Sequence, residues 1–168
     1  MEITTVLAQQ TQDWKSYIDP INKFRLDYPS IGFSSVDVTT DSPPFNGTYI
    51  SLPTEDFTFE VYIVNKSSLP DNIKSASEYA EYEKNNITIP VFGDASIFED
   101  LISVKYPNFN GTTYTAVLYG YDVGGNVIIK KVFVDHIDKI FYFLIRDDIT
   151  SFEERTSENI MRSVNFFE

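Results

Sequence analysis

Hydrophobic and polar residues alternate along several short segments of the chain, and a period of two is typical of half-buried β-strands. The clearest segment is 57–64, in which every second residue is Phe, Val or Ile. Segment 24–29 alternates in the same way and ends at Pro29, whose ring nitrogen cannot donate to a sheet. The same pattern, shorter or weaker, predicts further strands at 33–40, 49–52 and 98–106.

Three longer strands are predicted in the second half of the chain, at 112–121, 127–134 and 139–146. The residues between the first two are Asp-Val-Gly-Gly-Asn, which is a hairpin signal. The residues between the second and third, 135–138, are short enough to form a tight turn. We therefore expect these strands to form an antiparallel meander.

The hydrophobic period changes to that of a helix in two places, at 71–83 and at 149–164. Ser75 and Glu78 have the spacing of a capping box at the start of the first helix. Thr150 with Glu153, and Ser151 with Glu154, fit the same motif at the second. Together these elements predict an α+β domain in which a central antiparallel β-sheet is flanked by helices.

A chain of 168 residues is enough for one domain of ordinary size. We assign residues 13–168 to a single domain and residues 1–12 to a flexible tail. The short apolar stretch Val6-Leu7-Ala8 in this tail fits either the remnant of a signal peptide or a frayed polar terminus.

Composition excludes several classes of function. The chain has no cysteine, so disulfides, thiol catalysis and thiolate metal sites are absent. A net charge of −12 argues against binding to nucleic acid and against electrostatic docking on anionic lipid. No apolar run approaches the length of a membrane span, so no direct insertion into a membrane is expected. Aromatic residues make up 15% of the chain, which favours a sheet-rich protein.

Four Asn-x-Ser/Thr sequons are candidates for glycosylation: Asn46, Asn65, Asn86 and Asn110. All four lie in polar stretches where loops are expected. They favour an extracytoplasmic or cell-surface location over a cytoplasmic one, although a chain without cysteine fits either compartment.

The only group that resembles a metal site surrounds the single histidine, His136, which stands between Asp135 and Asp138. Carboxylates with one imidazole suit a divalent metal. Aspartate is also common in tight turns, and we consider a structural turn the better explanation. No residue pattern indicates a catalytic site or a cofactor, and we expect a protein that is not an enzyme. A small-molecule or divalent-metal binding protein that uses His136 and the nearby carboxylates is the alternative.

Aromatic side chains offer two further candidates. The predicted strand 112–121 contains three tyrosines, Tyr114, Tyr119 and Tyr121. They form either a binding surface or part of the core. Trp14 precedes the first predicted strand, where we expect it to cover one edge of the core.

Several short motifs, in their order and spacing, resemble the PsbP-like family. Tyr17-Ile-Asp-Pro20 followed by 24–29, Phe-Arg-Leu-Asp-Tyr-Pro, resembles the family's opening signature. The strand that begins at Phe57 and the Ser-Glu-Tyr-Ala helix at 77–80 continue the likeness. The segment 160–166, with Ser163 at its centre, resembles the terminal helix of the family. The resemblance covers the chain from Tyr17 to its end.

This resemblance implies an α/β/α sandwich, a fold shared with a nuclear import factor that binds the Ran GTPase. It identifies the chain as an exported member of the family. It also implies a binding or assembly role, because characterised members dock on larger complexes. The expected function is therefore non-catalytic binding of a protein partner or a membrane-associated complex.

Overall fold

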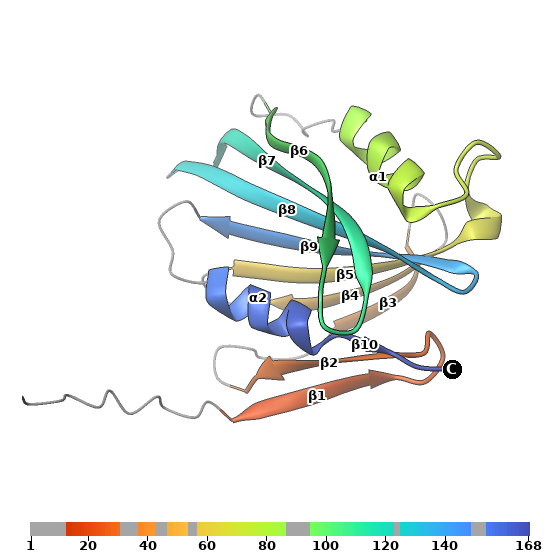
Figure 1. The fold of residues 1–168 in the computed structure, drawn as a ribbon. Helices are drawn as coiled ribbons and strands as arrows, with labels where there is room; N and C mark the ends of the chain where they lie inside the picture. Colours follow the sequence, from red (N-terminus) through yellow and green to blue (C-terminus); the bar gives the residue numbers. More distant parts are fainter. Residues whose placement is uncertain are drawn as a thin grey trace, which may run out of the picture.

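A computed structural model describes residues 13–30, 37–42, 47–53, 57–86, 95–122, 125–148 and 154–168 (Figure 1). The strands in chain order are β1 (Trp14–Asp19), β2 (Phe24–Pro29), β3 (Asp37–Ser42), β4 (Gly47–Pro53), β5 (Phe57–Asn65), β6 (Ala95–Lys105), β7 (Asn110–Asp122), β8 (Gly125–His136), β9 (Lys139–Asp148) and β10 (Asn165–Phe166). The helices are η1 (Lys66–Ser68), α1 (Ala76–Asn85) and α2 (Glu154–Ser163).

Seven strands form one large antiparallel sheet in the order β3-β4-β5-β9-β8-β7-β6. The predicted meander is confirmed, since β7 pairs with β8 and β8 pairs with β9 through short connections. The remaining strands form a small sheet in the order β1-β2-β10. In this small sheet the predicted strand 24–29 is confirmed as β2 with the same bounds.

Two strands of the small sheet were not predicted, and both lack a hydrophobic alternation. In β1 the first three residues are exposed and only Asp19 is buried. Strand β10 has only two residues. Pairing with β2 defines both strands: β1 forms a hairpin with it, and β10 joins it from the other end of the chain. Trp14 lies on β1 with 40% of its surface exposed. The prediction that Trp14 covers one edge of the core is therefore wrong.

The large sheet has a hydrophobic cluster on each face. On one face, α1 packs its Tyr79 and Ala80 against Tyr114, Phe133 and Tyr142 of the sheet. On the other face, α2 and the small sheet together bury a second cluster that includes Phe24, Leu26, Phe59, Phe143 and Ile160. The antiparallel α+β architecture is thus as expected. The second face, however, is covered by a helix and a sheet, and not by helices alone.

The size of the elements explains this difference. A helix of ten residues such as α2 is about 15 Å long. Seven strands about 4.8 Å apart make a sheet about 29 Å wide. One short helix leaves part of that face open, and the small sheet supplies Phe24 and Leu26 to cover it.

Helix α1 starts with the capping box that the sequence predicts. The Ser75 hydroxyl accepts a hydrogen bond from the Glu78 amide at 3.3 Å, and the Glu78 carboxylate accepts from the Ser75 amide at 3.0 Å. The Lys74 amide also donates to this carboxylate, and this bond, followed by the hydrogen bonds with Ser75, lowers the pKa of Glu78. No helix among the described residues is long and apolar enough to cross a bilayer.

Candidate functional site

The structure does not bring Asp135, His136 and Asp138 together. Asp135 and His136 are neighbours at the end of a strand, so their side chains point to opposite faces of the sheet. Asp138 lies in the two-residue turn that follows, where its carboxylate is 3.4 Å from the ammonium of Lys139. Within the described part of the chain, no three His, Asp or Glu side chains are grouped so that they could hold a metal ion.

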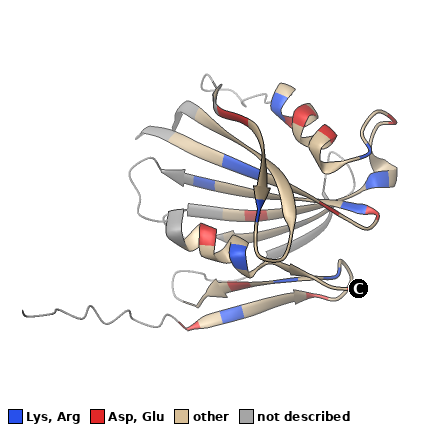
Figure 2. Ribbon diagram, in the orientation of Figure 1, with Lys and Arg blue, Asp and Glu red and all other residues tan. Residues whose placement is uncertain are grey.

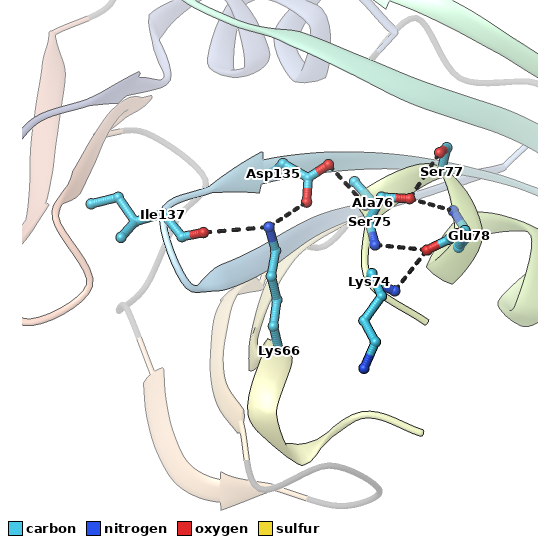
Figure 3. A network of polar contacts seen from close by, with 8 residues as sticks. All are labelled: Lys66, Lys74, Ser75, Ala76, Ser77, Glu78, Asp135 and Ile137. Atoms are coloured by element: carbon cyan, nitrogen blue, oxygen red, sulfur yellow. Dashed lines mark hydrogen bonds and ion pairs between the residues drawn. The ribbon is translucent and has the colours of Figure 1, made fainter. Parts of the chain in front are cut away.

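Asp135 joins the β8–β9 hairpin to α1 and η1 (Figure 3). One carboxylate oxygen accepts a hydrogen bond from the Ala76 amide, at the N-terminus of α1, at 2.9 Å. The other is 2.8 Å from the ammonium of Lys66, which also donates to the carbonyl of Ile137 at 3.3 Å. A carboxylate at a helix N-terminus is stabilised by the unpaired amides and the helix dipole. Asp135 therefore has a structural role.

His136 points to the opposite face, where its ring stacks on Phe166 of β10 with centroids 4.8 Å apart. The ring also meets Phe141 edge-on at 6.1 Å, and its buried Nε2 has no hydrogen-bond partner. Burial among these rings lowers the pKa of His136, while a hydrogen bond with the Phe167 backbone acts in the opposite direction. The imidazole therefore packs as an aromatic side chain that holds the C-terminal strand.

The lowered pKa predicts a pH-dependent stability. A histidine whose pKa is lower in the folded than in the unfolded state contributes stability that is present above the unfolded pKa and is lost as the pH falls. We expect the free energy of unfolding to decrease from about pH 6.5 downward. Urea unfolding at several pH values measures this decrease.

The His136→Phe variant is the control, because it keeps an aromatic ring and removes the titration. Its free energy of unfolding should fall less than that of the wild type over the same interval, while the carboxylates titrate alike in both. Identical pH profiles for the two proteins would contradict the assigned role of His136.

Of the two alternatives for the tyrosines of 112–121, Tyr114 fits the core and not a binding surface, because its side chain is fully buried. The side chains of Tyr119 and Tyr121 lie outside the described residues. Tyr114 stacks on Phe133, which in turn stacks on Tyr142, with centroids 5.9 and 5.5 Å apart. Tyr79 of α1 meets Phe133 edge-on. Tyr79 therefore completes an aromatic layer between α1 and the sheet.

A charged pair lies within this aromatic layer. The ammonium of Lys131 on β8 is 2.7 Å from the Glu83 carboxylate on α1, and both side chains are mostly buried. The same ammonium lies 5.4 Å from the centroid of the Tyr142 ring, which is a cation–π contact. Burial, followed by the charge of Glu83, raises the pKa values of Tyr79 and Tyr114. These hydroxyls stay protonated at ordinary pH and cannot serve as bases.

The sequence contains a weak signal of this cluster. Tyr79 and Glu83 are four residues apart and so share one face of a helix. A lysine in the middle of a predicted strand, as at 131, needs a partner if its neighbours are buried. Neither observation identifies Lys131 as the partner of Glu83, because the two are 48 residues apart.

The residues of the opening signature organise the first hairpin. The Asp19 carboxylate accepts hydrogen bonds from the amides of Ile21 and Asn22 and from the side chain of Asn22, all within 3.0 Å. Burial, followed by the charge of Asp19, raises the pKa of Tyr17 to about 12. Phe24 and Leu26 are fully buried in the core. Each of these signature residues thus builds the fold.

The terminal motif is bonded to the opening one. The hydroxyl of Ser163, the last residue of α2, accepts a hydrogen bond from the Asp27 amide at 2.8 Å. The same hydroxyl donates to the Ile160 carbonyl oxygen, with the two oxygens 2.6 Å apart. The two ends of the resemblance, 136 residues apart, therefore attach α2 to the small sheet.

Replacing Ser163 with alanine should lower the free energy of unfolding by about 1–2 kcal/mol, because the partly buried Asp27 amide loses its partner. Chemical denaturation measures the change. Ser16→Ala is the matched control, since this exposed hydroxyl also bonds to Asp27, through the carboxylate. We expect it to change stability by less than about 0.5 kcal/mol. Equal losses in both variants would show that the Ser163 contact has no special weight.

The sequons fall at exposed positions where the structure describes them. Asn65 ends β5, Asn86 follows α1, and Asn110 begins β7, all with exposed side chains. Asn46 lies outside the described residues. Exposed positions are a requirement for the proposed modification.

The arrangement of two sheets and two helices has counterparts among solved structures. The solution structure of cyanobacterial PsbP (CyanoP) from Synechocystis sp. PCC 6803 superposes with a TM-score of 0.66 over 95% of this chain and 96% of that one, at 14% identity. The chain has a PsbP-like fold. At this identity the likeness concerns the fold alone.

Two further proteins share this PsbP-like fold. A Bacteroides thetaiotaomicron protein matches with a TM-score of 0.57 and 12% identity, over 92% of this chain and 48% of that one. A protein of unknown function from Pseudomonas aeruginosa matches with a TM-score of 0.51 and 10% identity, over 89% and 94%. No family model and no curated protein matches the chain.

Proposed function

We propose that this PsbP-like domain is exported and acts without catalysis, by binding a protein partner or a membrane-associated complex. The observation that carries the proposal is the correspondence with cyanobacterial PsbP over almost the full length of both chains. The sequence motifs of the family add to it, since characterised members dock on larger complexes. The four sequons and the apolar Val6-Leu7-Ala8 support export.

The roles of the described polar residues agree with a binding function. Asp135 caps α1, Asp19 builds a turn, Ser163 joins α2 to β2, and Glu83 pairs with Lys131. Each of these groups has partners within the fold. These contacts fix the elements on which a binding surface would lie.

In-cell cross-linking tests the proposal. The chain carries a C-terminal affinity tag, is expressed at its native level, and is purified under denaturing conditions from the cytoplasmic, soluble extracytoplasmic and membrane fractions. We expect one protein to co-purify in comparable amount from an extracytoplasmic fraction, and not with the tag alone. A chain that stays in the cytoplasm would contradict export. A chain that sediments as a monomer in every fraction, with no cross-linked partner, would contradict binding.

A further inference from the structure

Three exposed isoleucines lie on the tips of two hairpins at one end of the molecule. Ile18 and Ile21 belong to β1 and to the turn that joins it to β2, and their side chains are 58% and 83% exposed. Ile137 belongs to the β8–β9 turn and is 69% exposed. Isolated exposed apolar residues are ordinary on protein surfaces. Three at the ends of two neighbouring hairpins call for an explanation.

The C-terminal segment holds the two tips together (Figure 1). The His136 ring, next to Ile137, stacks on Phe166, and Phe166 pairs with Phe24 in the small sheet. The Phe167 amide donates to the Lys23 carbonyl, in the β1–β2 turn, at 3.0 Å. The tips are therefore fixed relative to one another and form one surface.

The backbone at Ile137 is strained. Its φ of 54° lies in the left-handed region, where a β-branched side chain is a genuine outlier. Two-residue hairpin turns favour Asn or Gly at such positions. The side chain that causes this strain is exposed and gains little from packing inside the domain. Strain of this kind is a reason to look for a function outside the fold.

The charges around the tips differ from those of the whole chain. Ile18 lies directly opposite Arg25 in the β1–β2 pair, so both side chains are on one face of the small sheet. Segment 13–30 holds three basic and three acidic residues, for a net charge of 3 − 3 = 0, whereas the chain carries −12. Figure 2 shows the basic residues on β1, β2 and their turn.

Two of these cations are available to a partner. Among the described residues, neither Lys23 nor Arg25 has an ion pair, and both are exposed. Of the nearby anions, Asp19 is buried and bonded within its turn, and Asp138 lies beside Lys139. Glu168 is exposed and follows Phe167, whose amide bonds to Lys23, so one carboxylate lies beside the two cations. We define the tip patch as Ile18, Ile21, Lys23, Arg25 and Ile137. It combines apolar side chains with unpaired positive charge.

We propose that the tip patch is the docking surface for the protein partner of this domain, and that the partner presents an apolar pocket bordered by Asp or Glu residues. This inference rests on the proposed function. Apolar anchors that enter a pocket supply most of the affinity in such interfaces. The surrounding charge pairs orient the two proteins and speed their association.

Site-specific photocross-linking tests this surface. A photoreactive phenylalanine analogue replaces Ile21 in one protein and Ile102 in a control; Ile102 is 45% exposed on β6, at the edge of the large sheet. We expect a partner cross-linked in cells from position 21 and not from position 102. Its cross-linked peptide should contain acidic residues.

Two double variants complete the test on the partner so captured. Ile21→Ser/Ile137→Asn removes the apolar anchors, and asparagine suits the left-handed backbone, so the fold should be at least as stable. Lys23→Glu/Arg25→Glu reverses the charge. Each should weaken binding by about tenfold or more, whereas Ile102→Ser should not. Wild-type binding should also weaken as salt rises from about 0.05 to about 0.5 M.

The outcomes separate the docking surface from the proposed function. Equal binding of the partner by wild type and tip variants would overturn the docking surface and leave the proposed function intact. No captured partner from any position would overturn both. Sedimentation of the wild type, but not of the tip variants, with vesicles of equal parts phosphatidylcholine and phosphatidylglycerol would assign the patch to a lipid surface and overturn the inference. A dimer lost in the tip variants would assign it to a second copy, with the same consequence.

Discussion

Replacing Phe24 with alanine is expected to lower the free energy of unfolding by about 3–5 kcal/mol, which is the usual cost of emptying a buried aromatic site. The Phe24 side chain is fully buried. It meets Phe141 of the large sheet edge-on at 5.2 Å, and Tyr17 and Phe166 of the small sheet at 5.9 and 6.5 Å. Phe24 thus joins the two sheets through side chains alone. Since domains are stable by about 5–15 kcal/mol, the loss is a large part of the total.

Urea unfolding followed by circular dichroism measures this loss. Phe24→Leu keeps most of the volume and should cost less than about 1.5 kcal/mol, so it remains informative if the alanine variant does not fold. Ile102→Ala, at an exposed position on β6, should change stability by less than about 0.5 kcal/mol. A loss at Phe24→Ala no larger than that at Ile102→Ala would contradict the role of Phe24 in the core.

Replacing Lys131 with methionine should lower the free energy of unfolding by about 2–3 kcal/mol. The substitution keeps the apolar stem and leaves Glu83 as an unpaired carboxylate among buried tyrosines. Replacing both partners, as Glu83→Gln/Lys131→Met, should restore stability to within about 1 kcal/mol of the wild type. Tyr79 forms a side-chain hydrogen bond with Glu83, and the neutral amide of Gln can still accept it.

A double-mutant cycle with urea denaturation measures the coupling between Glu83 and Lys131. The matched control is the exposed pair Asp71 and Lys74, whose charged atoms are 3.7 Å apart. Lys74→Met should change stability by less than about 0.5 kcal/mol, because water screens such a pair. Similar losses for Lys131→Met and Lys74→Met would show that the buried position of the first pair has no effect.

The elements that could be predicted are those with a local cause. In β5 every second residue is apolar because one row of side chains faces the core cluster that contains Phe59 and Val61. The capping box of α1 depends on two residues that are three positions apart, so a short stretch of sequence is enough to predict it. Strand β1 has no such local pattern. It is an edge strand whose side chains are mostly exposed, and its pairing with β2 defines it.

The candidate residues follow the same division. A tight turn between β8 and β9 could be predicted, since aspartate favours such turns. The turn is shorter than the predicted 135–138, because Asp135 and His136 still pair within the β8–β9 ladder. The separate directions of Asp135 and His136 depend on α1 and β10, which pack on opposite sides of the hairpin. The exposure of Ile21 and Ile137 likewise depends on how distant segments lie around them.

By itself, the sequence determined the α+β class, the meander of β7, β8 and β9, both helices and the resemblance of several motifs to the PsbP-like family. These depend on periodicity and on contacts between near neighbours. Only the tertiary structure decided that a small sheet shares one face with α2, that Tyr114 is buried, and that Glu83 meets Lys131. It also brought the two hairpin tips together. Such contacts join residues far apart in the chain, and no local pattern records which of many possible partners a side chain meets.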